Sequence, residues 1–303
     1  MIRTPSVLST ARLDALPWAH ASGPFRALAH HFVVRTCDRA LGEYLGAVLD
    51  PFSVDGSAGD GQVAVPAYSI VDRGEATRNR YALYFGRERL ALTPSGSFVV
   101  ATLLWHVNRR AVESGDDFVL VHAGAVVWDG RAALFPAPME SGKTTLVAGL
   151  VRAGAGYLSD EAAAIDPHTL DVHPFPKSLT VGVGSWEVLA DLTPVVDPDV
   201  TRRYLLTEWH VDVRTIRPDA LAPATPPAFV IAARYERDAA TALLPMTRAE
   251  AVMEMGQNSF NLQRHGRQGV EALARVARRS TCHRLVVGDL DAACARLRDV
   301  LST

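Results

Sequence analysis

The chain carries at residues 137–145 the run Ala137-Pro138-Met139-Glu140-Ser141-Gly142-Lys143-Thr144-Thr145. A phosphate-binding loop has the pattern G-x-x-x-x-G-K-[ST] between a strand and a helix. The flanks agree, because an apolar run precedes it at Ala132–Phe135 and a helical run follows it at Leu146–Leu150. Successive backbone N–H groups in such a loop form a nest for anions, and the start of the following helix adds positive partial charge. We therefore expect all nine residues to contact a nucleotide.

The side chains of this candidate phosphate loop indicate the cofactors. We expect Lys143 to reach the β- and γ-phosphates of ATP and the Thr144 hydroxyl to bind Mg²⁺. Ala137 stands where the pattern has its first glycine, and alanine disfavours a positive φ, so we expect a differently shaped loop entry. The alternative is a Gly-Lys-Thr at a helix start without function. The correct spacing and both flanks favour the functional interpretation.

Two carboxylates follow the helix of the loop, at Asp160 and Glu161 in the run Tyr157-Leu-Ser-Asp-Glu161. Carboxylates at the end of a strand beside a phosphate loop can divide two tasks. One holds Mg²⁺, directly or through water, and the other takes the proton from an attacking hydroxyl. The alternative is a solvent-exposed Asp-Glu turn, which the position after the helix disfavours.

Further residues around the loop carry a resemblance. His122-Ala123 precedes the loop, and Arg152-Ala-Gly-Ala-Gly-Tyr-Leu-Ser-Asp-Glu161 and Pro174-Phe175-Pro176-Lys177 follow it. Residues 118 to about 180 resemble the catalytic domain of HPr kinase/phosphorylase, which has His-Gly before its loop and Asp-Asp after it. They are more similar still to the HPr-kinase-related proteins of peptide-modifying gene clusters, such as lasso-peptide kinases.

This resemblance implies an α/β fold, with a P-loop kinase domain of the HPr kinase/phosphoenolpyruvate carboxykinase type on a mixed sheet. It implies phosphate transfer to a serine hydroxyl, with Asp160 as general base. It places His122 near the transferred phosphate, although a hydrogen-bonded histidine at a sheet edge is the alternative. Thr144, Asp160 and Glu161 become the expected metal ligands; Glu161 is an aspartate in HPr kinase and reaches farther here. The HPr-binding run of that family is not visible, which speaks against HPr as substrate and against a reverse phosphorylase activity.

Other features have a functional and a plain structural interpretation. Lys177 follows prolines that fix the backbone. It is therefore a candidate for contact with the γ-phosphate or with the acceptor, and the alternative is an ordinary rigid loop. The pair Arg202-Arg203 can stabilise transition-state charge, but a solvated pair is the simpler interpretation. Arginines are frequent between Gln263 and Arg284. There the basic face of an amphipathic helix is favoured over a docking surface for an acidic peptide.

The alternation of apolar residues predicts two domains. Residues 1–115 form a small α+β domain for substrate recognition, and residues 116–303 form the catalytic domain. Residues 1 to about 25 are interpreted as a lead-in with little regular structure. Period-2 patterns predict separate strands at Phe118–His122 and Ala125–Trp128. Further predicted strands are His31–Arg35, Gln62–Val71, Arg80–Phe85, Arg89–Thr93, Ala132–Phe135, Tyr157–Ser159 and Ala162–Ile165, and predicted helices are Ala40–Leu49, Ser97–Ser114, Thr144–Arg152, Arg248–Met255 and Gln268–Arg278.

Composition narrows the classes of function. The 303 residues have a formal net charge of -2 and are 48% hydrophobic, which argues against nucleic acid as a partner. No apolar run resembles a signal peptide or a membrane span. The three cysteines fit neither a disulfide framework nor a zinc site, so we expect a cytoplasmic protein. A homo-oligomer remains open.

Three functions are compatible with these residues. The leading hypothesis is an ATP-dependent serine kinase acting on a peptide or small protein. A small-molecule kinase would use the same catalytic residues. A nucleotide-binding regulatory module without turnover is the third; the substitution at Ala137 favours it slightly, whereas Lys143, Thr144 and Asp160 oppose it.

Overall fold

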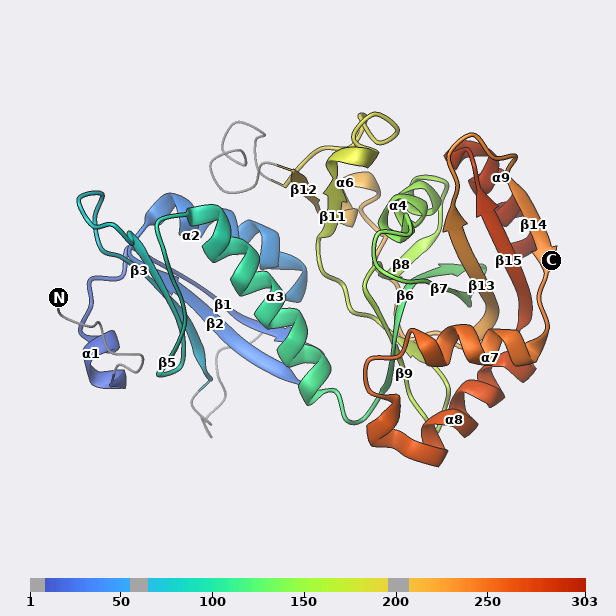
Figure 1. Cartoon of the computed structure of the whole chain (residues 1–303), viewed down its shortest axis with the longest axis horizontal. Helices are drawn as coiled ribbons and strands as arrows, with labels where there is room; N and C mark the ends of the chain where they lie inside the picture. The colour runs from blue at the N-terminus through green and yellow to red at the C-terminus, as the bar shows by residue number, and fades with distance from the viewer. Residues whose placement is uncertain (1–8, 55–64, 196–206) are drawn as a thin grey trace. The chain divides into compact units, whose positions relative to one another are not determined.

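The computed structural model describes residues 9–54, 65–195 and 207–303, and the chain divides into two compact units (Figure 1). The first contains the described residues up to Ser114 and those of Pro194–His210, and the second contains Gly115–Thr193 and Val211–Thr303. Each unit combines helices with a mixed sheet, which confirms the α/β class. The pair Arg202-Arg203 lies outside the described residues.

The first unit is built on a sheet with the strand order β1-β2-β3-β4-β5. Strand β4 is antiparallel to both of its neighbours, β3 and β5, and β2 runs parallel to β3. The strands are β1 (His20–Ala27), β2 (His30–Thr36), β3 (Ala67–Asp72), β4 (Tyr81–Phe85) and β5 (Glu88–Thr93), and the helices are α1 (Thr10–Asp14), α2 (Arg39–Leu49) and α3 (Gly96–Ser114).

The expectation of a lead-in without regular structure is wrong. Strand β1 pairs antiparallel with β2 and buries Phe25 and Ala27. The pair Gly23-Pro24 inside it is typical of a turn. The strand accommodates this pair through a shift of register between Ser22 and Phe25, which no alternation of residues could have indicated.

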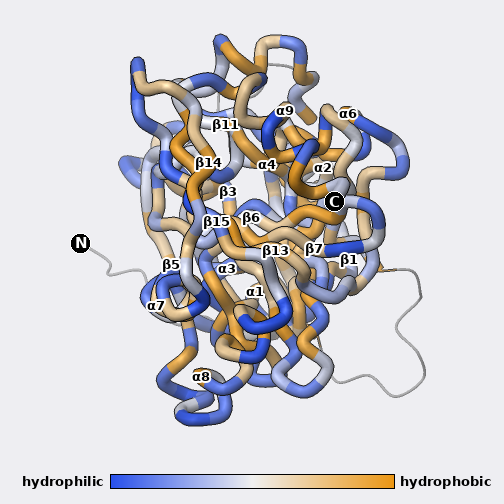
Figure 2. Tube along the Cα trace, turned by 90° about the vertical axis from the view of Figure 1, so that its right-hand side faces the viewer, coloured by the Kyte–Doolittle hydropathy of each residue, from blue (hydrophilic) through white to orange (hydrophobic). Residues whose placement is uncertain are grey.

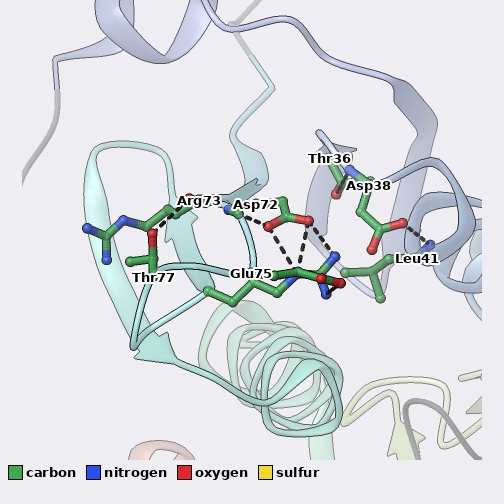
Figure 3. A network of polar contacts seen from close by, with 9 residues as sticks. Thr36, Asp38, Leu41, Asp72, Arg73, Glu75 and Thr77 are labelled. Carbon is green, nitrogen blue, oxygen red and sulfur yellow. Dashed lines mark hydrogen bonds and ion pairs between the residues drawn. The ribbon is translucent and has the colours of Figure 1, made fainter.

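Polar contacts fix the connections of this sheet (Figure 3). The Arg80 guanidinium donates to both carboxylate oxygens of Asp72, at 2.8 to 3.1 Å, and to Glu75 at 3.1 Å. These bonds hold the pKa of Asp72 below its usual value. At the start of α2, the Asp38 carboxylate accepts from the Leu41 N–H at 3.1 Å, which is a regular N-cap.

The second unit carries the candidate phosphate loop on a mixed sheet, as predicted. Its strand order is β10-β9-β6-β7-β13-β15-β14, with β8 also paired to β6. The three neighbours β7, β13 and β15 are parallel, and β6 and β14 are antiparallel to theirs. The strands are β6 (Val119–Trp128), β7 (Arg131–Pro136), β8 (Gly156–Ser159), β9 (Ala162–Ile165), β10 (Val172–His173), β13 (Pro227–Tyr235), β14 (Ala242–Pro245) and β15 (Thr281–Val287).

The two strands predicted on either side of Gly124 are one continuous strand, β6, so that prediction is wrong. Glycine weakens a strand pattern because it lacks a side chain. Here a Cβ at Gly124 would lie 2.7 Å from Cγ2 of Val147. The glycine therefore serves the close packing of helix α4 on the strand and does not end it.

Helices complete the second unit: α4 (Lys143–Arg152), α6 (Val213–Ile216), α7 (Arg248–Gln257), α8 (Leu262–Arg279) and α9 (Leu290–Leu301). The remaining short strands are β11 (Leu179–Gly182) and β12 (Glu208–Val211). Helix α8 alternates hydrophobic and hydrophilic residues along its trace (Figure 2). None of the helices in the described ranges is both long and apolar enough to cross a bilayer.

The arginines predicted to form a basic face are largely engaged within the unit. Arg264 pairs with Asp116 at 3.0 Å, and Arg284 pairs with Glu254 at 3.0 Å. Arg275 donates to two backbone carbonyl oxygens. These contacts favour the structural interpretation over a docking surface.

Candidate functional site

The loop between β7 and α4 leads from the end of a strand directly into the N-terminus of a helix. Strand β7 ends at Pro136 and helix α4 starts at Lys143, with Gly142 as its N-cap at a φ of 87°. A side chain there would be strained by this φ, although the nearest atom to its Cβ, Cβ of Tyr235, would lie at 3.4 Å. Glycine at this position is therefore favoured by the backbone conformation of the loop.

Alanine at the first position of the pattern is accommodated without strain. The positive φ angles of the loop occur at Glu140 and Gly142 and not at Ala137. Ala137 is buried, and its N–H donates to the carbonyl oxygen of His122 at 3.3 Å. Alanine at this position therefore requires no unfavourable φ angle. The hydrogen bond from its N–H connects the start of the loop to strand β6 at His122.

The Lys143 ammonium lies over its own loop. Its Nζ donates to the carbonyl oxygens of Ala137 at 2.9 Å and of Pro138 at 2.6 Å. Burial lowers the pKa of Lys143 to about 8, so most of the protein carries a charged Lys143 at neutral pH. The ammonium group is held by backbone carbonyl oxygens beside the start of helix α4. It can exchange these acceptors for the oxygens of an incoming phosphate.

The structure brings the loop and the acidic pair together. The Thr144 hydroxyl donates to Oδ2 of Asp160 at 2.8 Å, across 16 positions of sequence. Asp160 lies in the turn between β8 and β9, where Oγ of Ser159 accepts from the N–H groups of Glu161 and Ala162. The residues expected to bind Mg²⁺ are therefore adjacent.

Asp160 is buried and has further donors. The Tyr157 hydroxyl lies 2.9 Å from Oδ1, and Nζ of Lys177 lies 3.0 Å from Oδ1 and 3.2 Å from Oδ2. The sequence patterns did not indicate the contact of Tyr157 with Asp160. The available signal was the Tyr157 hydroxyl in a strand that is predicted to be buried, since buried polar groups are almost always hydrogen-bonded.

Glu161 and His122 lie in the electrostatic field of the same cluster. Burial raises the pKa of Glu161, an effect opposed by Lys177 and reinforced by Asp160. Burial, with help from Lys143, lowers the pKa of His122 to about 4. His122 is therefore a neutral imidazole at neutral pH and can offer one N–H and one lone pair.

The position of His122 is set by a segment from far along the chain. The N–H of His122 donates to the carbonyl oxygen of Asn258 at 2.7 Å, and its ring contacts that of Phe260 in a tilted arrangement with centroids 5.3 Å apart. Two residues before, the Leu120 N–H donates to Oδ1 of Asn261 at 2.9 Å. This segment, Asn258–Asn261, which we call the β6 strap, was not assigned a role from sequence.

Thr145, the last residue of the loop, points elsewhere. Its hydroxyl lies 2.6 Å from Oγ of Ser185. The side chain of Met139 is largely exposed, with 79% of its surface accessible. Of these loop side chains, Thr144 contacts Asp160, whereas Thr145 contacts Ser185 and Met139 is exposed.

The residues present fit a magnesium nucleotide. Mg²⁺ usually keeps several waters and is bound by one or two carboxylates together with substrate phosphates. Thr144, Asp160 and Glu161 supply a hydroxyl and two carboxylates beside the amide-lined loop. In the ranges that the structure describes, no three His, Cys, Asp or Glu side chains form a complete metal site of their own.

Comparison with known proteins adds no relative. No protein-family model matches the chain, and no curated protein matches it.

Proposed function

We propose that this protein is an ATP-dependent kinase that transfers the γ-phosphate to a serine hydroxyl of a peptide or small protein. The observation that carries the proposal is the 2.8 Å contact between the Thr144 hydroxyl and Asp160. It joins a loop suited to a triphosphate with a buried carboxylate suited to its metal and its acceptor. Serine as the acceptor rests on the sequence resemblance.

The chain's own residues then have distinct roles. The loop amides and Lys143 hold the phosphates, and Thr144 and the acidic pair hold Mg²⁺, which when bound neutralises charge on the phosphate oxygens. The serine oxygen forms a bond to the γ-phosphorus while the bond to the bridging oxygen breaks and ADP leaves. Asp160 receives the serine proton. His122, being neutral, donates a hydrogen bond to the phosphoryl group.

The test is phosphate transfer from ATP to a panel of acceptors in the presence of Mg²⁺. Peptides with one serine, the same peptides with alanine, and small alcohols are incubated with the protein and weighed by mass spectrometry. We expect a mass gain of one phosphate on serine peptides alone. Transfer to small alcohols alone would identify a small-molecule kinase, and nucleotide binding without any transfer would identify a regulatory module.

Variants separate the site from the rest of the chain. Lys143→Ala is expected to reduce transfer by about 100-fold or more, because a preorganised cation facing the transferred phosphate is lost. Arg267→Ala is the matched control, since it removes a positive charge from a side chain that is 91% exposed on α8. Full turnover by Lys143→Ala would refute the proposal.

A further inference from the structure

The basic residues of this chain are distributed unevenly between lysine and arginine. Of 31 basic residues, the only lysines are Lys143 and Lys177. Both are buried, at 6% and 8% exposure, in a residue class that is almost never buried unless paired. Lys177 contacts both oxygens of Asp160, and both lysines act to lower the pKa of the neighbouring Glu161. A compact ammonium on a flexible stem, unlike a planar guanidinium, can change partners with little constraint of geometry.

The Lys177 ammonium forms an ion pair with the buried Asp160 carboxylate and so compensates its negative charge. A carboxylate has about four lone-pair directions. Those of Asp160 are used by the hydroxyls of Thr144 and Tyr157 and by Nζ of Lys177, which contacts both oxygens. Nζ of Lys177 also lies 3.4 Å from Oγ1 of Thr180 and from the carbonyl oxygen of Ser178. The single proton of the Tyr157 hydroxyl is shared with the carbonyl oxygen of Lys177, which lies 3.0 Å away. The Lys177 ammonium is therefore the main donor that a serine proton must displace, because it contacts both oxygens of Asp160.

Binding of a magnesium nucleotide changes this balance. Thr144 and Asp160 would hold a divalent cation, and the Lys177 ammonium, which contacts the same carboxylate, would then be repelled by it, because like charges a few ångströms apart interact strongly in a buried site. The nucleotide brings negative phosphate oxygens to the same place. The Lys177 ammonium would therefore exchange its ion pair with Asp160 for an ion pair with the phosphate.

We propose that Lys177 is a second phosphate-binding lysine, which neutralises Asp160 before nucleotide binds and then moves to the transferred phosphate, leaving Asp160 able to accept the serine proton. This inference rests on the proposed function, and it adds a residue whose partner changes during the reaction. It also explains why Asp160 can be fully paired in this structure and still act as the base.

An ATP acyl phosphate provides a direct test on the wild-type protein. A lysine amine near the phosphates attacks the acyl carbonyl, an amide bond forms, and the carbon–oxygen bond to phosphate breaks to release ATP. Because the chain has two lysines, peptide mass mapping assigns each product without ambiguity. We expect acylation of both Lys143 and Lys177, and protection of both by excess magnesium nucleotide. The variant Arg267→Lys supplies an exposed lysine that should remain unlabelled at the same probe concentration.

The outcomes separate this inference from the function it rests on. Labelling of Lys143 without Lys177 would overturn the inference and leave the kinase proposal standing. Absence of labelling on both, together with absence of nucleotide binding by calorimetry, would overturn both.

A second measurement uses the variant Lys177→Met. With the competing ammonium removed, Mn²⁺ alone should bind about tenfold or more tightly, as followed by the electron paramagnetic resonance of free Mn²⁺. Transfer should fall by about 100-fold with little change in the KM for ATP, and Lys177→Arg should restore part of it. Unchanged Mn²⁺ affinity together with unchanged transfer would overturn the inference.

Discussion

Acid is expected to destabilise the first unit through His30. This imidazole is 4% exposed in the sheet, where it stacks on Phe32 and lies 3.3 Å from the Tyr68 hydroxyl. Burial lowers the pKa of His30 from 6.5 to about 4, and the positive field of Arg110, with smaller effects of His106 and His31, acts in the same direction.

The direction and size of the change in stability with pH follow from these two pKa values of His30. Since the folded pKa lies below the unfolded one, the unfolded chain takes up the proton first as the pH falls. Stability is therefore lost from about pH 6.5 downwards, and the loss is complete below about pH 4. One pKa unit corresponds to about 1.4 kcal/mol, so between about pH 7.5 and 4.5 His30 removes about 2.5 kcal/mol.

The assay must report the first unit alone, because His122 in the second unit also has a lowered pKa. Hydrogen exchange of peptides from β2, measured across a urea series at both pH values, gives the local stability. His30→Phe keeps an aromatic ring in place and removes the ionisation, and the Tyr68 hydroxyl retains its 2.7 Å contact with His106. This variant should lose about 2.5 kcal/mol less than wild type on acidification.

A matched control lies on the same strand. His31 is exposed, so His31→Gln should lose as much stability as wild type between the two pH values. If His30→Phe and wild type lost equal stability in the β2 peptides, the argument from burial would be refuted.

Three other substitutions test the second unit. Gly142→Ala should cost about 1 to 2 kcal/mol, measured by urea unfolding, because φ is 87° there, and should weaken nucleotide binding in calorimetry. Asn261→Ala should cost about 1 to 3 kcal/mol in the same unfolding measurement, since it leaves the buried N–H of Leu120 unpaired. His122→Ala should lower the rate of transfer by about tenfold or more with ATP affinity nearly unchanged; a normal rate would exclude a role for His122.

Sequence patterns predict the parts of this fold that local chemistry determines. The strand before the loop and the helix after it follow from the period of the apolar residues, and β7 and α4 occur where expected. Strand β1 was missed because Gly23-Pro24 breaks its pattern. Strand β6 was divided because Gly124 has a packing role that only the position of Val147 makes evident.

The sequence predicts which residues belong to the site, but it does not predict the contacts between them. The pattern of the loop and the run ending at Glu161 name Lys143, Thr144 and Asp160. The ion pair of Asp160 with Lys177 joins residues 17 positions apart across a turn and a loop. No spacing rule anticipates such a contact, because it depends on how β8 and the following segment pack.

The β6 strap connects the site to segments that lie far from it in the sequence. It joins the end of helix α7 to the start of α8, and it fixes the backbone of β6 at both Leu120 and His122. Any displacement of this helical hairpin is consequently transmitted to the imidazole. A library of random mutants screened for lost transfer should therefore yield a cluster of hits in α7 and α8, about a hundred residues downstream of the catalytic loop.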